Sequence, residues 1–285
     1  MLRSLNTGIS GLRFQQDKLD VIGNNIANVN TVGFRAGRAQ GVDIFSQKLS
    51  EFSTSSSSSE VGSGVALVDV SNSFTQGTID STGQPYDMAI DGSGFFIVRD
   101  TATNGLYATR AGDFRADKDG FLTTVDGYRV QGEIPGSPGV SSDIKITLTP
   151  TTPALPADTE AVSWRIEPNG DVKLSLRSTA VPPPATPPEP LKIAQIQVQT
   201  FRDINGLTKV GNNRFGNLAA AGPVGLGAPG QAGRGQIRWQ ALEQANVDLA
   251  TQFTDLMVTQ RGYQANAKII TTSDEILQEL INLKR

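Results

Sequence analysis

The sequence predicts an α+β protein, in which a discontinuous β-rich domain is combined with long N- and C-terminal α-helices that form a coiled-coil-like inner domain. Apolar residues recur every seven positions at both ends of the chain, as amphipathic helices require. The middle contains short β-type runs separated by turn residues. The 30 glycines and 15 prolines among 285 residues indicate many turns and disfavour a wholly helical fold.

The N-terminal helix is expected over residues 2–29. Its apolar stripe, which Ile9 and Ile22 supplement, repeats every seven residues and comprises Leu5, Leu12, Leu19 and Ile26. The pattern stops at residues 28–33, where Asn and Gly favour a helix end followed by a turn.

The C-terminal helix, expected over residues 247–283, gives the strongest periodic signal. Residues recur every seven positions at Leu249, Leu256, Tyr263, Ile270 and Leu277. Phe253 occupies the companion position four residues after Leu249. Asn246 and Asp248 predict an N-cap and a first-turn acid, and a helix of this length would span about 55 Å. Gln260 and Asp274 interrupt the companion positions, so we expect packing against several neighbours.

Strands are expected at residues 65–70, 87–90, 94–98, 106–110, 128–130, 143–148, 162–166, 172–176 and 193–201. Hairpin-type turns are expected at residues 91–94, 117–120 and 126–127. Linkers or surface loops are expected at the serine-rich residues 53–59, the proline-rich residues 181–190 and the glycine-rich residues 222–235.

These elements predict four parts. Residues 1–30 and 246–285 form the terminal-helix domain, and residues 31–73 form a connecting segment that includes the serine-rich stretch. Residues 74–144 and 191–245 form the β-rich domain, and residues 145–190 form an insertion that ends in the proline-rich linker.

The composition excludes several functional classes. A net charge of -3 without long single-sign runs gives no footprint for nucleic acid, and no apolar run is long enough for membrane insertion. The chain has no Cys and no His, which removes disulfides, thiolate nucleophiles, the usual zinc sites and Ser-His catalysis. A hydrolase that uses carboxylates alone stays an open alternative, although nothing nominates a pair.

Two segments resemble ligand-binding motifs only in part. Residues 225–230 match the letters of a dinucleotide loop, but Pro229 and further glycines follow where a helix is needed. Residues 113–120 match part of a calcium loop but lack its closing Glu and its flanking helices. We therefore predict no catalytic residue, no metal site and no cofactor.

The apolar stripes are predicted to bind other copies of the chain. They are long, they lie at opposite ends of the sequence, and the β-rich middle carries its own apolar strands. Stripes that the chain cannot cover itself would bind copies of themselves, and a head-to-tail contact that does not close produces a helical tube.

Residues 19–34 closely resemble the N-terminal motif of the flagellar hook and rod axial proteins. The motif positions are Asn24, Asn25, Asn28, Gly33 and Phe34. Residues 74–78, 82–96, 109–114 and 127–128 resemble that family's β domain, and residues 242–249 and 260–267 resemble its C-terminal helix. The chain is thereby identified as a member of this family.

The resemblance implies a structural subunit of the bacterial flagellum and not an enzyme. Such a subunit is exported through the flagellar type III export apparatus and forms a tubular homo-oligomer around a central channel, with the terminal helices as the inner tube. Its partners would be adjacent rod, hook or hook-cap proteins. It would act outside the cytoplasm, in the basal body or the hook.

Within the family, the sequence resembles two members. Residues 23–25 and 272–285 resemble the hook protein, so the first expectation is the tubular hook, which transmits motor torque for swimming motility. Residues 162–176, 211–215 and 229–235 resemble the distal rod subunit, and 285 residues is short for a hook protein. The distal rod is the alternative, and a secreted carbohydrate- or calcium-binding β module is a more remote one.

Overall fold

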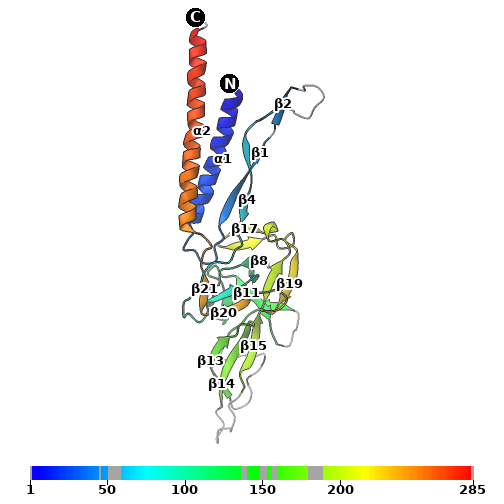
Figure 1. Ribbon diagram of the computed structural model, residues 1–285. Coiled ribbons are helices and arrows are strands. Elements are labelled where there is room, and N and C mark those ends of the chain that lie inside the picture. Colours follow the sequence, from blue (N-terminus) through cyan, green and yellow to red (C-terminus); the bar gives the residue numbers. More distant parts are fainter. Residues whose placement is uncertain are drawn as a thin grey trace. The chain divides into compact units, whose positions relative to one another are not determined.

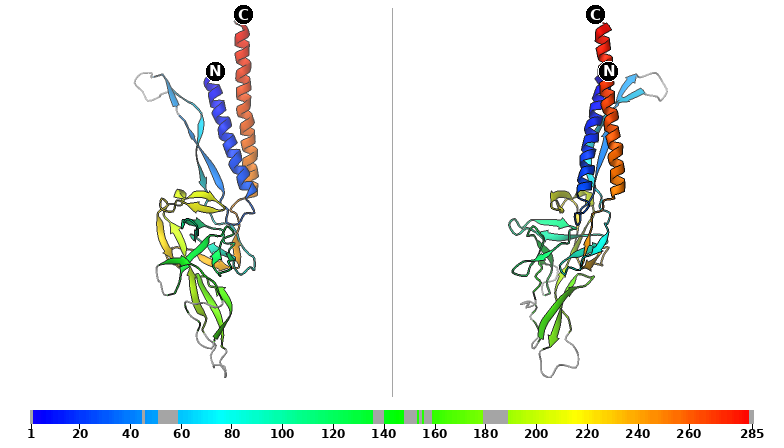
Figure 2. Two further views of the ribbon diagram at one scale, coloured as in Figure 1. Left: turned by 180° about the vertical axis from the view of Figure 1, so that it is seen from behind. Right: turned by 90° about the vertical axis from the view of Figure 1, so that its left-hand side faces the viewer.

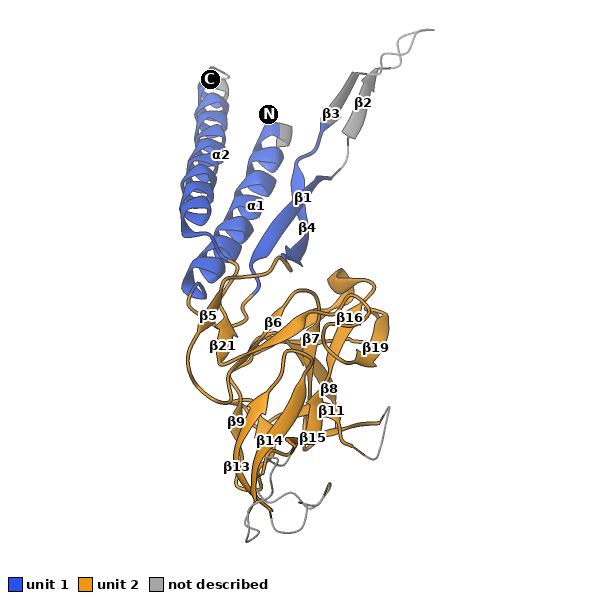
Figure 3. Ribbon diagram, turned by 60° about the horizontal axis from the view of Figure 1, so that its bottom comes forward, with its two compact units in different colours: residues 1–29, 35–73, 247–285 blue, residues 30–34, 74–246 orange. Residues whose placement is uncertain are grey.

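The computed structural model of the chain describes residues 2–44, 46–50, 59–135, 140–147, 153, 155, 159–178 and 189–283. The chain forms two compact units, which Figure 3 colours separately. Unit 1 comprises residues 1–29, 35–73 and 247–285, and unit 2 comprises residues 30–34 and 74–246. The serine-rich and proline-rich segments lie almost wholly outside the described residues.

Unit 1 contains both predicted terminal helices, α1 (Leu2–Ala27) and α2 (Leu249–Leu283), side by side and antiparallel (Figures 1 and 2). The N-cap of α2 differs from the prediction. The Asp248 carboxylate accepts the Ala250 amide at 3.0 Å and the Thr251 hydroxyl at 2.7 Å, so Asp248 is the cap. The Asn246 amide instead donates to the Thr75 carbonyl at 3.0 Å in unit 2.

Beside α1 lies an antiparallel ladder of β1 (Gly37–Asp43) and β4 (Val65–Asn72), and β2 (Ser46–Ser50) pairs with β3 (Ser59–Gly62). This hairpin occupies the stretch expected to be a connector. A Cβ atom at Gly41 would lie 2.7 Å from the Phe14 ring, so the glycine lets the β1 backbone approach the helix closely.

Unit 2 is β-rich, and every strand pair described in it is antiparallel. Its 13-stranded sheet has a main path in the order β13-β14-β15-β11-β7-β8-β18-β17. The strands on this path are β7 (Phe95–Arg99), β8 (Leu106–Thr109), β11 (Arg129–Glu133), β13 (Thr159–Ile166), β14 (Asp171–Ser178), β15 (Leu191–Ile196), β17 (Thr208–Gly211) and β18 (Arg214–Gly216). The strands beside it are β9 (Arg115–Ala116), β10 (Leu122–Thr123), β12 (Ser141–Asp143), β16 (Val198–Phe201) and β19 (Pro223–Gly227).

The described part of unit 2 also contains two smaller ladders and one short helix. The ladders pair β5 (Ile79–Ser81) with β21 (Ala241–Glu243) and β6 (Met88–Asp91) with β20 (Gln236–Trp239). The 3-10 helix η1 spans Ile204–Gly206.

Strand β7 is the centre of unit 2 because both of its faces are buried. Phe96 and Val98 pack into one apolar cluster, and Phe95 and Ile97 pack into another. Alternate residues of a strand point to opposite faces, so a strand covered on both sides becomes a continuous apolar run. This explains why residues 94–98 gave a clear strand signal.

Four local predictions were wrong. Residues 91–94 do not form a hairpin, because they join β6 to β7, which pair with different partners. Residues 143–147 contain the last residue of β12 and a single bridge at Lys145 instead of a strand. Residues 193–201 are divided between β15 and β16, and the glycine-rich residues 222–235 contain β19. None of the helices in the described part of the chain is both long and apolar enough to cross a membrane.

Candidate assembly surfaces

The contact between α1 and α2 is lined by small and polar residues. A Cβ atom at Gly11 would lie 2.6 Å from the Asn266 amide nitrogen, and one at Gly262 would lie 2.8 Å from the Gln15 amide nitrogen. Only glycine permits so close an approach without displacing these side chains. Several apolar side chains of α2 lie outside this contact and are exposed.

Asn25 is the polar centre of this contact. Its amide donates to the Gly37 carbonyl at 2.8 Å and to Gln252 Oε1 at 3.0 Å, while its oxygen accepts the Gly37 amide at 2.8 Å. The side chain is buried, so these bonds satisfy groups that would otherwise lie unpaired away from water. One residue thus joins α1, α2 and β1.

The predicted stripe positions lie beside the helix contact. On α1 the residues that are buried are Gly8, Gly11, Ile22 and Asn25. The predicted positions that are half-buried are Leu5, Leu12, Leu19, Ile26, Leu256, Ile270 and Leu277. The predicted positions that are exposed are Leu249, Phe253 and Tyr263. Coiled-coil-like packing of these residues stays a prediction about the assembled protein.

Exposed apolar residues lie on both flanks of α2. With Thr259 at the centre of the α1 contact and about 100° of rotation per residue, Phe253 falls on one flank and Val258 on the other. The first flank comprises Leu249 and Phe253, the second comprises Val258, Ile269 and Ile276, and Met257 lies on the face turned away from α1. Phe253 is 49% exposed and Val258 is 61% exposed, so the chain itself covers neither flank. Heptad counting missed four of these six residues, because they lie off the seven-residue line.

The C-terminal end of α2 extends past α1. Gly8 faces Ile270 and Gly11 faces Asn266. The two antiparallel helices advance by about one residue each, so Leu2 lies opposite about residue 276. Ile281 and Leu283 lie beyond that point and are 67% and 82% exposed. The last two turns thus present uncovered apolar side chains.

The remaining positions of the N-terminal motif close α1 and shape the segment that follows. Asn28 donates its side-chain amide to the Asn24 carbonyl at 3.0 Å and to Asn24 Oδ1 at 2.7 Å, which satisfies groups at the helix end. Gly33 has φ +67°, and a Cβ there would lie 2.5 Å from the Ala111 amide. Phe34 is buried, and its ring centroid lies 4.7 Å from the ammonium of Lys209.

A buried ion pair in unit 2 joins two segments that are 133 residues apart. Arg110 Nη1 lies 3.1 Å from Glu243 Oε2, and both side chains are buried. Glu243 Oε1 also accepts the Gly77 amide at 3.0 Å, and Arg110 Nη2 donates to the Gly92 carbonyl at 2.8 Å. Both charged residues lie in segments that carry the family resemblance, but the sequence alone assigned them no role.

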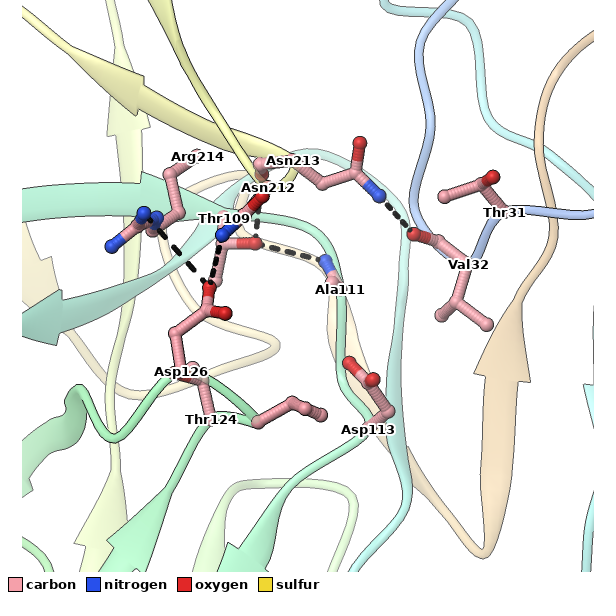
Figure 4. Close-up of a pocket in the computed structure, with 11 residues that line it drawn as sticks. Thr31, Val32, Thr109, Ala111, Asp113, Thr124, Asp126, Asn212, Asn213 and Arg214 are labelled. Atoms are coloured by element: carbon pink, nitrogen blue, oxygen red, sulfur yellow. Dashed lines mark hydrogen bonds and ion pairs between the residues drawn. The ribbon is translucent and has the colours of Figure 1, made fainter. Parts of the chain in front are cut away.

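Unit 2 also contains a pocket of about 240 Å³ (Figure 4). Its lining residues are Thr31, Val32, Thr109, Ala111, Asp113, Thr124, Val125, Asp126, Asn212, Asn213 and Arg214. Residues 113–120, which resemble part of a calcium loop, contain the turn between β9 and β10. In the described ranges, no group of three or more Asp or Glu residues is placed to hold a metal ion.

Comparisons with known proteins agree with this architecture. Three family models match: flagella basal body rod protein over residues 5–35, flagellar hook protein FlgE/F/G D1 domain over residues 89–174, and flagellar basal body rod FlgEFG protein C-terminal over residues 240–283. The first and third cover α1 and α2, and the second lies within unit 2.

Relatives that align over the full length of the chain are named as flagellar rod or hook proteins. The chain is 39% identical to the flagellar basal-body rod protein FlgG of Bacillus subtilis over 292 residues, which cover 100% of each chain. It is 34% identical to the protein of that name from Caulobacter vibrioides, covering 99% of this chain and 100% of the relative. It is 27% identical to the flagellar hook protein FlgE of Borreliella burgdorferi over 443 residues, covering 100% of each.

A β-rich unit combined with a unit built from both chain ends is thus the architecture of a flagellar axial protein. The chain belongs to the flagellar hook and basal-body rod protein family, and it is a component of the bacterial flagellum. Membership implies assembly with other flagellar axial proteins. The higher identity to rod proteins favours the rod alternative over the hook that we first expected.

Proposed function

We propose that this chain is the distal rod subunit of the flagellar basal body, a structural protein without enzymatic activity. It polymerises into a tube around a central channel and transmits motor torque along the axis. The two rod relatives, aligned over 99–100% of this chain, support the rod assignment. The observation that carries self-assembly is the pair of exposed apolar flanks on α2.

The flanks supply the free energy of assembly. Burying one Leu, Ile, Phe or Met side chain contributes about 1.5–3 kcal/mol relative to leaving it exposed. Phe253 and Val258 lie on opposite sides of the α1 contact, so α2 can bind a different neighbour on each side. Such contacts are heterologous, and repeating them produces a helical tube instead of a closed dimer.

The polar contact inside unit 1 complements this arrangement. Because glycines and Asn25 hold α1 close against α2, the flanks of α2 stay exposed within one copy. In the assembled tube the predicted stripe positions, which are half-buried or exposed in one copy, then pack further between copies in a coiled-coil-like manner. The terminal helices form the inner domain of that tube.

The further partners follow from this assignment. Adjacent rod, hook or hook-cap proteins would contact the ends of the tube, and the flagellar type III export apparatus would deliver the chain to its end. The proposal includes no cofactor, no nucleic acid and no insertion into a membrane.

The test is electron cryotomography of a strain from which the gene for this chain has been deleted. A rod subunit predicts a basal body truncated within the rod, with the hook also missing because nothing supports it. A complete rod that lacks only the external curved segment would identify the hook subunit and overturn the proposal. An unchanged flagellum would remove the chain from the axis altogether.

A further inference from the structure

The pocket in unit 2 is held open by its own hydrogen bonds. Asn212 and Asn213, in the turn between β17 and β18, have φ of 49° and 55°. The side-chain amide of Asn213 donates to the Val32 carbonyl at 2.7 Å (Figure 4). The side-chain amide of Asn212 donates to Oδ2 of Asp126 at 3.0 Å. The Thr109 hydroxyl donates to the Asn213 carbonyl at 2.9 Å. The walls are therefore fixed before any ligand arrives.

Two of the three charged groups in the pocket neutralise each other. Asp126 Oδ2 lies 3.9 Å from Arg214 Nη2, and the Arg214 guanidinium lies over the Tyr128 ring at 3.9 Å from its centroid. This acid and this base therefore already have partners.

Asp113 is the exception. Its carboxylate points toward the middle of the lining residues in Figure 4, and no side chain in the described part of the protein bonds to it. Burial raises the pKa of Asp113, and the nearby Asp87 and Asp126 charges raise it further, while its own backbone amide and Arg115 act against them. A half-buried carboxylate among like charges is stabilised by a cation that enters the pocket.

The size of the pocket restricts what that cation can be. Sites for drug-sized ligands and cofactors occupy roughly 300–1,000 Å³, and this pocket is smaller at about 240 Å³. It fits one long side chain with a charged end. Lys and Arg combine an apolar stem with a cationic head that pairs with a carboxylate.

We propose that the pocket receives the Lys or Arg side chain of a neighbouring copy of this chain, whose cation pairs with Asp113. This inference rests on the proposed self-assembly, because each copy then supplies both a pocket and a cation. Unit 2 offers matching groups: Lys118, Arg177 and Arg202 are exposed and form no ion pair with the described residues. The contact is a β-domain contact, separate from the flanks of α2.

The test compares Asp113→Asn with Asp119→Asn in the full chain, expressed in a strain without its own copy. Asp119 is an exposed acid on the nearby β9–β10 turn, so the change in net charge is the same. The amount of chain in purified basal bodies and the amount secreted into the medium are both measured, together with the thermal unfolding of the purified chain. We expect Asp113→Asn to reduce incorporation at least about tenfold, with unchanged secretion and an unchanged or higher unfolding temperature.

Incorporation of Asp113→Asn at the wild-type level would overturn the inference, and so would a loss of incorporation that follows a lowered unfolding temperature. If the wild-type chain itself fails to enter basal bodies, the proposed function fails instead, so the two failures are distinguishable.

A charge exchange identifies the occupant. Asp113→Lys is combined in the same chain with Lys118→Asp, Arg177→Asp or Arg202→Asp, which restores opposite charges across the contact. We expect one combination to recover incorporation at least about tenfold over Asp113→Lys alone. If none does, a cation from a second copy is not the occupant.

Discussion

Asn25 on α1 and Gln252 on α2 are joined by a hydrogen bond of 3.0 Å between two helices that lie at opposite ends of the chain. The same Asn25 side chain holds both the amide and the carbonyl of Gly37 at 2.8 Å. Unit 1 thus combines this polar contact with apolar packing at Ile22 and Ile270. The apolar flanks of α2 stay exposed for neighbouring subunits.

Asn25→Ala should destabilise unit 1. The change leaves the Gly37 amide and carbonyl and the Gln252 side chain without partners, at a cost of about 1–3 kcal/mol for each buried polar group that water cannot reach. Urea unfolding of the purified chain, followed by far-ultraviolet circular dichroism, measures the loss. Asn6→Ala on the exposed side of α1 is the control and should be neutral or slightly stabilising. Equal effects of the two changes would contradict the role of Asn25.

Gly23→Ala should stabilise the chain more than Gly11→Ala. At Gly23 an added Cβ meets nothing within 4 Å, so alanine should stabilise α1 by about 0.5–1 kcal/mol through helix propensity. At Gly11 the same atom lies 2.6 Å from Nδ2 of Asn266, so the Asn266 side chain must move, and this repacking offsets the gain from helix propensity. The free energies of unfolding of the two variants measure this difference. A Gly11→Ala chain as stable as the Gly23→Ala chain would show that the helices are not in close contact at Gly11.

Phe253→Lys and Val258→Lys should each block incorporation into basal bodies while leaving a folded chain. Each places a charge on a different apolar flank of α2, and an unpaired charge is costly to bury in a contact between copies. Thr254→Lys, on an exposed position of the same helix, should incorporate normally. Immunoblots of purified basal bodies measure incorporation. If only one flank proves sensitive, α2 contacts one neighbour and the two-sided arrangement is wrong.

Asp248→Asn should make the helix content of α2 less dependent on pH in acid. Hydrogen bonds from the Thr251 hydroxyl and from the Ala250 amide hold the pKa of Asp248 below its usual value of 3.8. A lowered folded pKa means that the ionised cap stabilises the helix above the unfolded pKa and that this contribution is lost as the pH falls through the folded pKa. Helix content measured from pH 5 downward should fall more steeply near and below pH 3.8 in the wild type than in Asp248→Asn. Parallel curves would rule out the cap.

Arg110→Met should unfold unit 2 far more readily than Arg165→Met. Removing Arg110 deletes the ion pair of 3.1 Å with the fully buried Glu243 carboxylate, and breaking a buried pair costs about 3–5 kcal/mol. The pair of Arg165 with Glu167 is exposed, so its loss should cost less than about 1 kcal/mol. Chemical denaturation followed by tryptophan fluorescence separates the two cases. A loss below 1 kcal/mol for Arg110→Met would mean that the pair is not buried in solution.

The terminal helices and the central strands could be predicted from the sequence because their apolar patterns are strong. Strand β4 was also expected, at residues 65–70, but its partner β1 could not be predicted, since β1 consists largely of Gly and polar residues and is shaped by its contact with α1. Strand β19 was read as a loop because its glycines and proline are turn residues, although pairing with β16 makes it a strand.

The assembly surface could be predicted only in part. Heptad counting found Leu249 and Phe253 on one flank of α2, but it passed over Val258 and Ile276 on the other. Periodicity arguments assume that the buried side of a helix is apolar, whereas the α1 contact is made by Gly11, Asn25 and their partners. The Arg110–Glu243 pair and the Asp113 pocket arise from residues far apart in the chain, and only the fold brings them together.

Electron cryo-microscopy of basal bodies isolated from the source bacterium tests the central claim most directly, at a resolution that traces side chains. We expect this chain in the distal rod, with α2 contacting one neighbour through Leu249 and Phe253 and another through Val258 and Ile269. A rod built from other subunits, or a rod containing this chain with both flanks of α2 facing water, would contradict it.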